Sequence, residues 1–115
     1  MNFIEPNKLV DFDGDVATIC FPNSLILHPM QGGIVSVDIR VKIPETHCGM
    51  LFETKGAFSK GLTIGSKLIH PGYQGNLELH VRNLSDTVVE FKAGESMVNL
   101  CLVATLSPGD YRSNP

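Results

Sequence analysis

Hydrophobic and polar positions alternate along residues 77 to 82 of the chain. Apolar residues stand at 77, 79 and 81, and polar residues stand at 78, 80 and 82. A period of two places one row of side chains on a core face and the other row toward solvent, as in a β-strand. Residues 83 to 87 have the composition of a turn, and Val89 and Phe91 then resume the alternation. The pattern predicts two strands joined as a hairpin.

The segment from Met97 to Thr105 is almost continuously apolar and rich in branched residues. Such a run is typical of a strand that is buried on both faces, with a short buried helix as the alternative. Further short strands are predicted at 16–21, 25–27, 34–43 and 50–53, between segments that contain Gly and Pro. The 11 Gly and 7 Pro residues are spread so evenly that long helices are not expected outside residues 76–107. The chain is therefore predicted to be all-β, as a sandwich, a jelly roll or a small barrel.

The length, composition and charge of the chain indicate the number of domains, the presence of a core and the class of partner. The 115 residues suit one domain covering 1–115, with an amino-terminal segment at 1–15 and a short tail at 107–115. With 43% hydrophobic and 18% charged residues, the chain is able to bury a core. The net charge of −3 argues against nucleic acid as a partner, because nucleic-acid binders gain affinity from clustered Lys and Arg.

Cysteine usage and the absence of export signals indicate a compartment. Cys20, Cys48 and Cys101 are too few for a disulfide framework, so a reducing environment is expected. Glu5 and Pro6 stand where a secretory signal would carry basic residues and then an apolar stretch. The longest apolar run is far shorter than the roughly 20 residues that cross a bilayer. We expect a soluble protein of the cytoplasm, neither secreted nor membrane-spanning.

Two segments with fixed glycine positions resemble a known family. Residues 69–75 are Ile-His-Pro-Gly-Tyr-Gln-Gly, and residues 94–100 are Gly-Glu-Ser-Met-Val-Asn-Leu. These segments resemble the third and fourth motifs of the trimeric dUTPase and dCTP deaminase family. Residues 43–45, Ile-Pro-Glu, are similar to the family's Leu-Pro-Glu-Gly corner. The resemblance extends over about residues 24–106.

The resemblance implies a fold of the β-clip type, a jelly-roll-like barrel that assembles as a homotrimer with nucleotide pockets at the subunit junctions. In the family the tyrosine at the position of Tyr73 packs against the deoxyribose. Gly56, Gln74, Gly75 and Asn99 are the other positions that correspond to nucleotide-binding residues. Gly72 and Gly75 are expected to adopt a positive φ in the turn around Tyr73.

The positions that carry chemistry in the family hold other residues here. His70 replaces the aspartate that activates the attacking water in dUTPases. His80 replaces the catalytic glutamate of the deaminases, and Glu78 lies two residues earlier on the same strand face. The phosphate-binding Pro-Arg-Ser-Gly motif falls on residues 53–56, where Gly56 is retained and Lys55 replaces the serine. His70, His80 and Lys55 are therefore predicted to be remnants, and no catalytic residue is assigned.

The first and fifth motifs of the family have no clear copy. Residues 13–16, Asp-Gly-Asp-Val, are the nearest fragment of the first, and the tail at 107–115 is too short for the glycine-rich arm. The four histidines and three cysteines show no spacing typical of a metal site, and Cys20 and Cys101 are interpreted as buried apolar residues. No metal and no cofactor is expected, with Mg²⁺ required only if the chain is an active enzyme.

Three functions remain open at this stage. The leading hypothesis is a trimer of viral or phage origin that has lost nucleotide hydrolysis and acts by binding an unidentified protein, similar to the dUTPase-derived adenoviral early-region proteins. The loop at 45–50 and the tail from Ser107 are the candidate contact surfaces. The second hypothesis is an active dUTP or dCTP hydrolase or deaminase with His70 as its base. The third is a trimeric decoration protein of a virus particle. A deoxynucleotide is a further candidate ligand.

Overall fold

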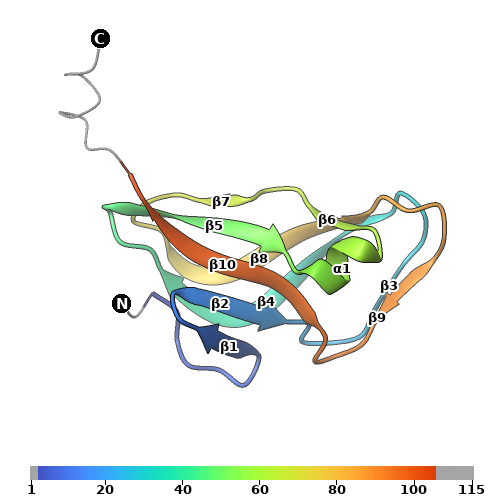
Figure 1. Cartoon of the computed structure of the whole chain (residues 1–115), viewed down its shortest axis with the longest axis horizontal. Helices are drawn as coiled ribbons and strands as arrows, with labels where there is room; N and C mark the ends of the chain where they lie inside the picture. Colours follow the sequence, from blue (N-terminus) through green and yellow to red (C-terminus); the bar gives the residue numbers. More distant parts are fainter. Residues whose placement is uncertain (1–2, 106–115) are drawn as a thin grey trace, which may run out of the picture.

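The computed structural model describes residues 3–105 as a nearly all-β structure with one short helix (Figure 1). This confirms the predicted fold class. The elements in chain order are β1 (Val10–Asp13), β2 (Val16–Cys20), β3 (Leu25–Leu27), β4 (Gly32–Lys42), β5 (His47–Glu53), α1 (Lys55–Ser59), β6 (Leu62–Ile64), β7 (Leu68–Ile69), β8 (Gln74–Asn83), β9 (Val89–Phe91) and β10 (Ser96–Ala104).

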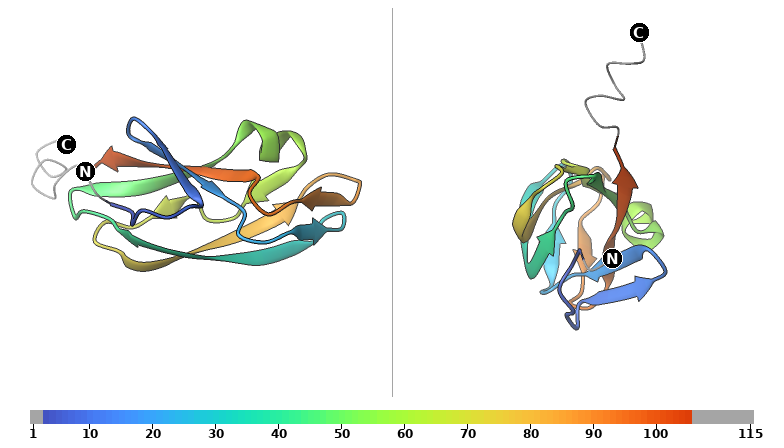
Figure 2. Two further views of the ribbon diagram at one scale, coloured as in Figure 1. Left: turned by 90° about the horizontal axis from the view of Figure 1, so that it is seen from below. Right: turned by 90° about the vertical axis from the view of Figure 1, so that its left-hand side faces the viewer.

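The strands form two main layers and a small third sheet. A five-stranded antiparallel sheet has the order β1-β2-β10-β5-β7, and a three-stranded antiparallel sheet has the order β4-β8-β6. The pair β3-β9 lies at one end of the molecule (Figure 1). Figure 2 shows β5 and β10 in one layer and β4 and β8 in the other, so that both layers present a face to a common core.

The long strands β4 and β8 alternate as predicted. In both strands every second residue is buried, and those residues belong to the hydrophobic core. Burial of the apolar row supplies the main stabilising free energy of this layer, at about 25 cal/mol per Å² removed from water. The buried apolar residues of the two strands are Val35, Val37, Ile39, Val41, Leu77, Leu79 and Val81.

The predicted hairpin between residues 77–81 and 89–91 is wrong. β8 pairs with β4 and β6, whereas β9 pairs with β3. The cause is the fully buried side chain of Asn83, whose Nδ2 donates to the carbonyl oxygen of Leu27 at 3.1 Å and to that of Thr87 at 2.8 Å. These bonds fix the end of β8 beside β3, so the chain that follows meets β3 instead of folding back on β8.

The prediction that residues 97–105 are buried on both faces is also only partly correct. Met97, Val98 and Leu100 are buried, but the later residues of β10 are half-buried or exposed. Cys20 and Cys101, predicted to be buried, are half-buried because they lie on the outer face of the five-stranded sheet. No layer of the described chain covers that face.

The one described helix, α1, interrupts the all-β pattern. Thr54 caps it, since its side chain accepts a hydrogen bond from the backbone N–H of Ala57 at 3.3 Å. Within residues 3–105, no helix has the length and apolar character needed to span a membrane.

Candidate functional site

The glycine-framed turn between β7 and β8 is held against the end of β4. The N–H of Gly72 donates to the carbonyl oxygen of Ile43 at 3.0 Å, and the N–H of Ile43 donates to that of Tyr73 at 2.9 Å. Gly72 has a φ of +82°, a backbone angle that residues other than glycine rarely adopt. The structure thus places two segments singled out in the sequence, 43–45 and 69–75, side by side.

The ring of Tyr73 folds over its own turn. Its hydroxyl donates to the carbonyl oxygen of Asn76 at 2.7 Å, and 42% of the residue remains exposed. A Cβ atom at Gly75 would lie 2.9 Å from the Tyr73 hydroxyl oxygen, which is too close for a real contact. Gly75 is therefore needed for the close approach of this ring, and the turn presents the ring to solvent.

A pocket of about 290 Å³ opens beside this turn. Leu51, Leu68, Ile69 and Leu77 form its apolar lining, and its polar groups come from Ser66, His70, Tyr73, Asn76, Glu78 and His80. Small-molecule sites commonly combine such an apolar lining with a few polar groups, with volumes from roughly 300 Å³ upward. The pocket has the size and composition of a small-ligand site.

The structure brings together two histidines that the sequence analysis treated as separate. His70 follows β7 and His80 lies on β8, and both line the same pocket. The Nε2 atom of His80 lies 3.9 Å from a carboxylate oxygen of Glu78, with both side chains 58% exposed. Imidazole and carboxylate groups are the side chains most often used as general acids and bases.

The phosphate-binding positions lie elsewhere in the chain. Lys55 and Gly56 are exposed at the start of α1, which follows the far end of β5. The seven residues of β5 extend about 20 Å at the rise of a strand. The pocket contacts β5 through Leu51 and the loop after β6 through Ser66, and its other lining residues belong to β7, β8 and their turn. Lys55 and Gly56 do not line the pocket within one chain.

Asn99, in the segment that resembles the fourth motif, and Thr54, the cap of α1, both form hydrogen bonds within the fold. The Asn99 side-chain oxygen accepts a bond from the Thr18 hydroxyl at 2.7 Å on the outer face of the sheet. The hydroxyl of Thr54 donates to the carbonyl oxygen of Ser96 at 3.2 Å. Gln74 begins β8 and is exposed, but it does not line the pocket.

Glu53 has a structural environment that the sequence did not suggest. Its side chain is 8% exposed, lies 3.1 Å from the Lys67 ammonium, and accepts hydrogen bonds from the Thr63 hydroxyl and the Ile64 N–H. Burial alone would raise the pKa of Glu53. The hydrogen bonds of its carboxylate to backbone N–H groups, Lys67 and Thr63 outweigh this effect, so the pKa lies below its ordinary value. Because its charge is paired, Glu53 is an anchor for β6.

Two features considered in the sequence analysis concern a metal site and the tail. Within residues 3–105, no group of three or more His, Cys, Asp or Glu side chains is arranged to hold a metal ion. The tail at 107–115 lies outside the described residues.

Sequence reasoning missed Ser66 and Asn76 as pocket residues and placed too little weight on Glu78. The strand period contained part of the signal, because residues 76, 78 and 80 share one face of β8. Ser66 had no such signal, since it lies in the loop between β6 and β7.

Known sequences support a family assignment. A family model described as dUTPase matches residues 17–110. The dCTP deaminase of Thermococcus kodakarensis is 26% identical over 104 residues, covering 89% of this chain and 67% of the relative. The deoxyuridine 5'-triphosphate nucleotidohydrolase of a Hydrogenobaculum species is 28% identical over 93 residues, covering 76% of this chain and 62% of the relative. The chain thus spans about two thirds of the length of these relatives.

Solved structures agree on the fold. The EIAV dUTPase has a TM-score of 0.81 at 15% identity, with 92% of this chain and 93% of that chain covered. A dUTPase of Staphylococcus bacteriophage 80alpha with dUpNHpp has a TM-score of 0.78 at 21% identity, with 94% of both chains covered. Because the dUTPase family model matches most of its residues, the chain belongs to the dUTPase family, within the dUTPase and dCTP deaminase superfamily.

Proposed function

We propose that this protein binds a deoxyribonucleotide in the pocket beside Tyr73 and has lost the family's hydrolysis, so that it acts as a regulatory, protein-binding homotrimer. The observation that carries the proposal is the composition of the pocket. The pocket keeps the tyrosine and the glycine-framed turn, but His70 and His80 occupy the two positions that carry the catalytic acids in the resemblance.

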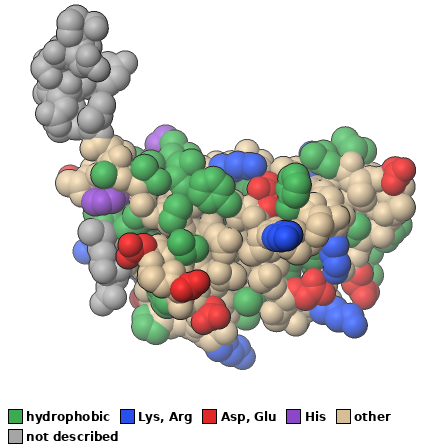
Figure 3. Space-filling view, viewed as in Figure 1, with side chains coloured by type: hydrophobic (Ala, Val, Ile, Leu, Met, Phe, Trp, Pro, Cys, Tyr) green, Lys and Arg blue, Asp and Glu red, His purple; other side chains and the backbone are tan. Residues whose placement is uncertain are grey.

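The separation of the motifs supports a trimer. Lys55, Gly56 and Asn99 do not line the pocket of their own chain, so a complete nucleotide site requires residues from another copy. The outer face of the five-stranded sheet offers a contact surface for that copy. Cross-strand neighbours on β10, β5 and β7 form an apolar row on this face, consisting of Cys101, Met50 and Leu68, with Phe52 and Val103 beside it. Figure 3 shows hydrophobic side chains gathered over β5 and β10.

The residues at the family's phosphate-binding positions support the loss of hydrolysis. The oriented arginine fork of the family is replaced by Thr54, whose hydroxyl is already used by Ser96 and Ala57. Lys55 retains a positive charge but is exposed and makes no ion pair with the described residues. A single mobile ammonium attracts a phosphate without fixing its orientation. The fold likeness to dUTPases of EIAV and of a bacteriophage supports a viral or phage origin for such a repurposed chain.

The test combines ligand binding with turnover. Thermal unfolding of the full chain is measured with dUTP, dCTP, dUMP and dCMP, because a ligand bound to the folded state adds about 2.7 kcal/mol at a hundredfold excess over Kd. Pyrophosphate and ammonia release are followed in the same samples with Mg²⁺ present. We expect a rise in Tm with at least one nucleotide and no turnover. Turnover that is abolished by His70→Ala would overturn the proposed loss of catalysis, and no shift with any nucleotide would overturn the binding.

An active enzyme is the second candidate, favoured by one specific observation. Glu78 supplies a carboxylate 3.9 Å from His80 inside the pocket, so a proton acceptor is present although both family acids are replaced. In this candidate His70 or the His80–Glu78 pair would deprotonate the attacking water. The described residues provide no donor set of three acids, histidines or cysteines for a metal, so no step is assigned to Mg²⁺. Turnover lost in both His70→Ala and Glu78→Gln would identify this function.

A further inference from the structure

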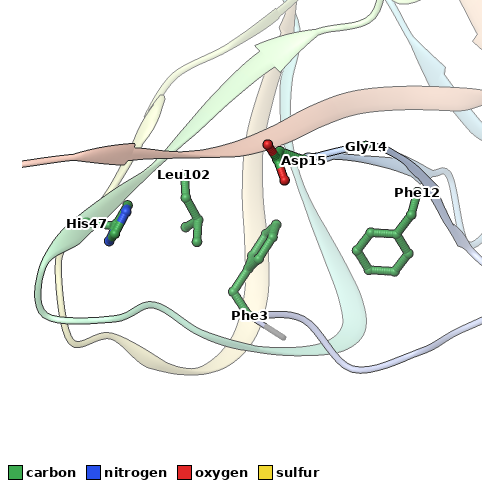
Figure 4. A pocket seen from close by; sticks show the side chains of 6 residues that line it. All are labelled: Phe3, Phe12, Gly14, Asp15, His47 and Leu102. Atoms are coloured by element: carbon green, nitrogen blue, oxygen red, sulfur yellow. The ribbon is translucent and has the colours of Figure 1, made fainter. Parts of the chain in front are cut away.

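A second pocket lies between the amino-terminal segment, the turn from β1 to β2, and the ends of β5 and β10 (Figure 4). Its volume is about 280 Å³, and it shares no lining residue with the pocket beside Tyr73. Phe3, Leu102 and Phe12 supply its apolar walls, and Asp15 and His47 supply its polar groups. Phe12 is 49% exposed although its ring lies on the inner side of β1, opposite Ala17. The pocket therefore leaves a large aromatic surface uncovered.

One wall of this pocket is an open strand edge. β2 pairs with β10 only as far as Val16 and Cys101, whereas β10 continues to Ala104 with β5 as its one partner among the described strands. Gly14, with φ of +63°, turns the chain away just before the next position. The N–H of Thr105 donates to Thr46, and the carbonyl of Met97 accepts from Thr54, so odd-numbered residues of β10 direct their peptide groups to β5.

The even-numbered residues of β10 direct their peptide groups away from β5. In an antiparallel strand, successive peptide groups point to opposite neighbours. The N–H and C=O groups of Leu102 and Ala104 consequently face the side on which β2 has ended. An exposed edge of this kind is a template for an added strand.

The rim of the pocket is acidic. Asp15 is the acid that lines it, exposed and without an ion pair among residues 3–105, whereas Asp11 and Asp13 lie on the opposite face of β1 from Phe12. His47 directs Nδ1 to the Thr46 hydroxyl at 2.8 Å. The charge of the rim favours a cationic ligand, and the rings favour one with a large apolar side chain.

We propose that an extended segment of another protein pairs with the Leu102–Ala104 edge, inserts a large apolar side chain between Phe3 and Phe12, and places a Lys or Arg beside Asp15. Main-chain hydrogen bonds give such a complex its affinity, and the pocket gives it specificity. The regulatory function proposed above requires a protein partner, and this site would bind one. The biological role of the site rests on that proposed function, but the binding itself does not. Nucleotide binding at Tyr73 is a separate event.

The test uses a labelled, end-capped octapeptide, Thr-Lys-Val-Arg-Phe-Lys-Val-Thr, added to the full chain. Fluorescence anisotropy gives the Kd, and hydrogen exchange gives the protection of the Leu102 and Ala104 amides. We expect saturable binding that weakens with salt, and slower exchange at both amides. Phe12→Ser should weaken binding about tenfold, and Asp15→Asn about two- to fivefold. Asp86→Asn, an exposed acid in the turn after β8, and His70→Ala should leave the Kd unchanged.

Several outcomes would overturn the proposal. Equal binding of a peptide with Glu in place of Lys and Arg would remove the role of the acidic rim. Equal affinity of wild type and Phe12→Ser for the peptide would show that the pocket does not take part in binding. Amides of Leu102 and Ala104 that are protected without peptide would show that the edge is already occupied, by a second copy if protection rises with protein concentration and by another part of the same chain if it does not.

Discussion

The carboxylate of Glu78 and the Nε2 atom of His80 lie 3.9 Å apart on one face of β8, inside the pocket that Tyr73 borders. Their two-residue spacing on a strand puts both side chains on the same face. We propose this pair as the group that would transfer a proton if the pocket performs chemistry in addition to binding.

Substitution of the pair should separate binding from folding. Both side chains are 58% exposed, and an exposed ion pair contributes only about 0–1 kcal/mol to stability. We expect Glu78→Gln and His80→Asn to change the free energy of unfolding by less than about 0.5 kcal/mol, while the nucleotide-dependent rise in Tm decreases. Glu90→Gln, an exposed acid outside the pocket, is the control. Unchanged nucleotide shifts in both pocket variants would exclude the pair from the binding site.

Gly75→Ala should displace the Tyr73 ring. The added Cβ would lie 2.9 Å from the Tyr73 hydroxyl oxygen and 3.2 Å from the adjacent ring carbon. We expect the nucleotide-dependent rise in Tm to be lost, with a loss of stability of about 1–3 kcal/mol. Gly33→Ala is the matched control, because its Cβ would meet Leu27 at an ordinary 3.7 Å. Calorimetry with and without nucleotide checks both effects, and a Gly75→Ala protein that behaves like Gly33→Ala would refute the role given to the ring.

Asn83→Ala should be strongly destabilising. The Asn83 amide donates to Leu27 and Thr87, and its oxygen accepts from the N–H and the hydroxyl of Ser85. Its removal leaves buried groups without partners, at a cost of about 2–4 kcal/mol. Urea unfolding measures the change against Asn23→Ala, an exposed asparagine in the loop before β3. Similar midpoints for the two variants would contradict the role of Asn83 as the link between β8 and β3.

Glu53 should contribute to acid sensitivity. Because its pKa is lower in the folded chain than in the unfolded chain, the unfolded state binds the proton more readily. The stabilisation is complete above the ordinary carboxyl pKa of about 4.3 and is lost as the pH falls through the lower folded value. We expect Glu53→Gln to cost about 1–3 kcal/mol at pH 7 and to flatten the fall in stability between pH 5 and pH 3. Equal slopes for wild type and variant in urea titrations would contradict this assignment.

The apolar outer face should hold the copies together. Phe52 is 47% exposed on this face, and a charge placed there would be buried without a partner in an assembly. We expect Phe52→Asp to reduce the mass measured by light scattering from that of a trimer to that of a monomer. Phe58→Asp on α1, at a residue that is 66% exposed, should leave the mass unchanged. A monomeric wild type at micromolar concentration would refute the trimer itself.

The local pattern of the sequence predicted the longer strands, because burial of alternate residues produces a period of two, but it did not predict β1, β6 or β7. The alternation of β4 and β8, the glycine-framed turn at 72–75 and the resemblance in residues 69–75 and 94–100 were all accessible without coordinates. Each of these features depends only on neighbours in the chain. The family assignment followed from the same segments.

Tertiary structure alone decided which strands pair and which side chains meet. β8 and β9 are neighbours in sequence, but the buried amide of Asn83 directs β9 to β3. His70 and His80 share a pocket because the turn around Gly72 connects β7 in one sheet to β8 in the other. Glu53 is paired because the loop after β6 brings Lys67 to it. Residue identity fixes what a side chain is able to do, whereas long-range contacts fix its neighbours, and those contacts depend on the packing of the whole chain.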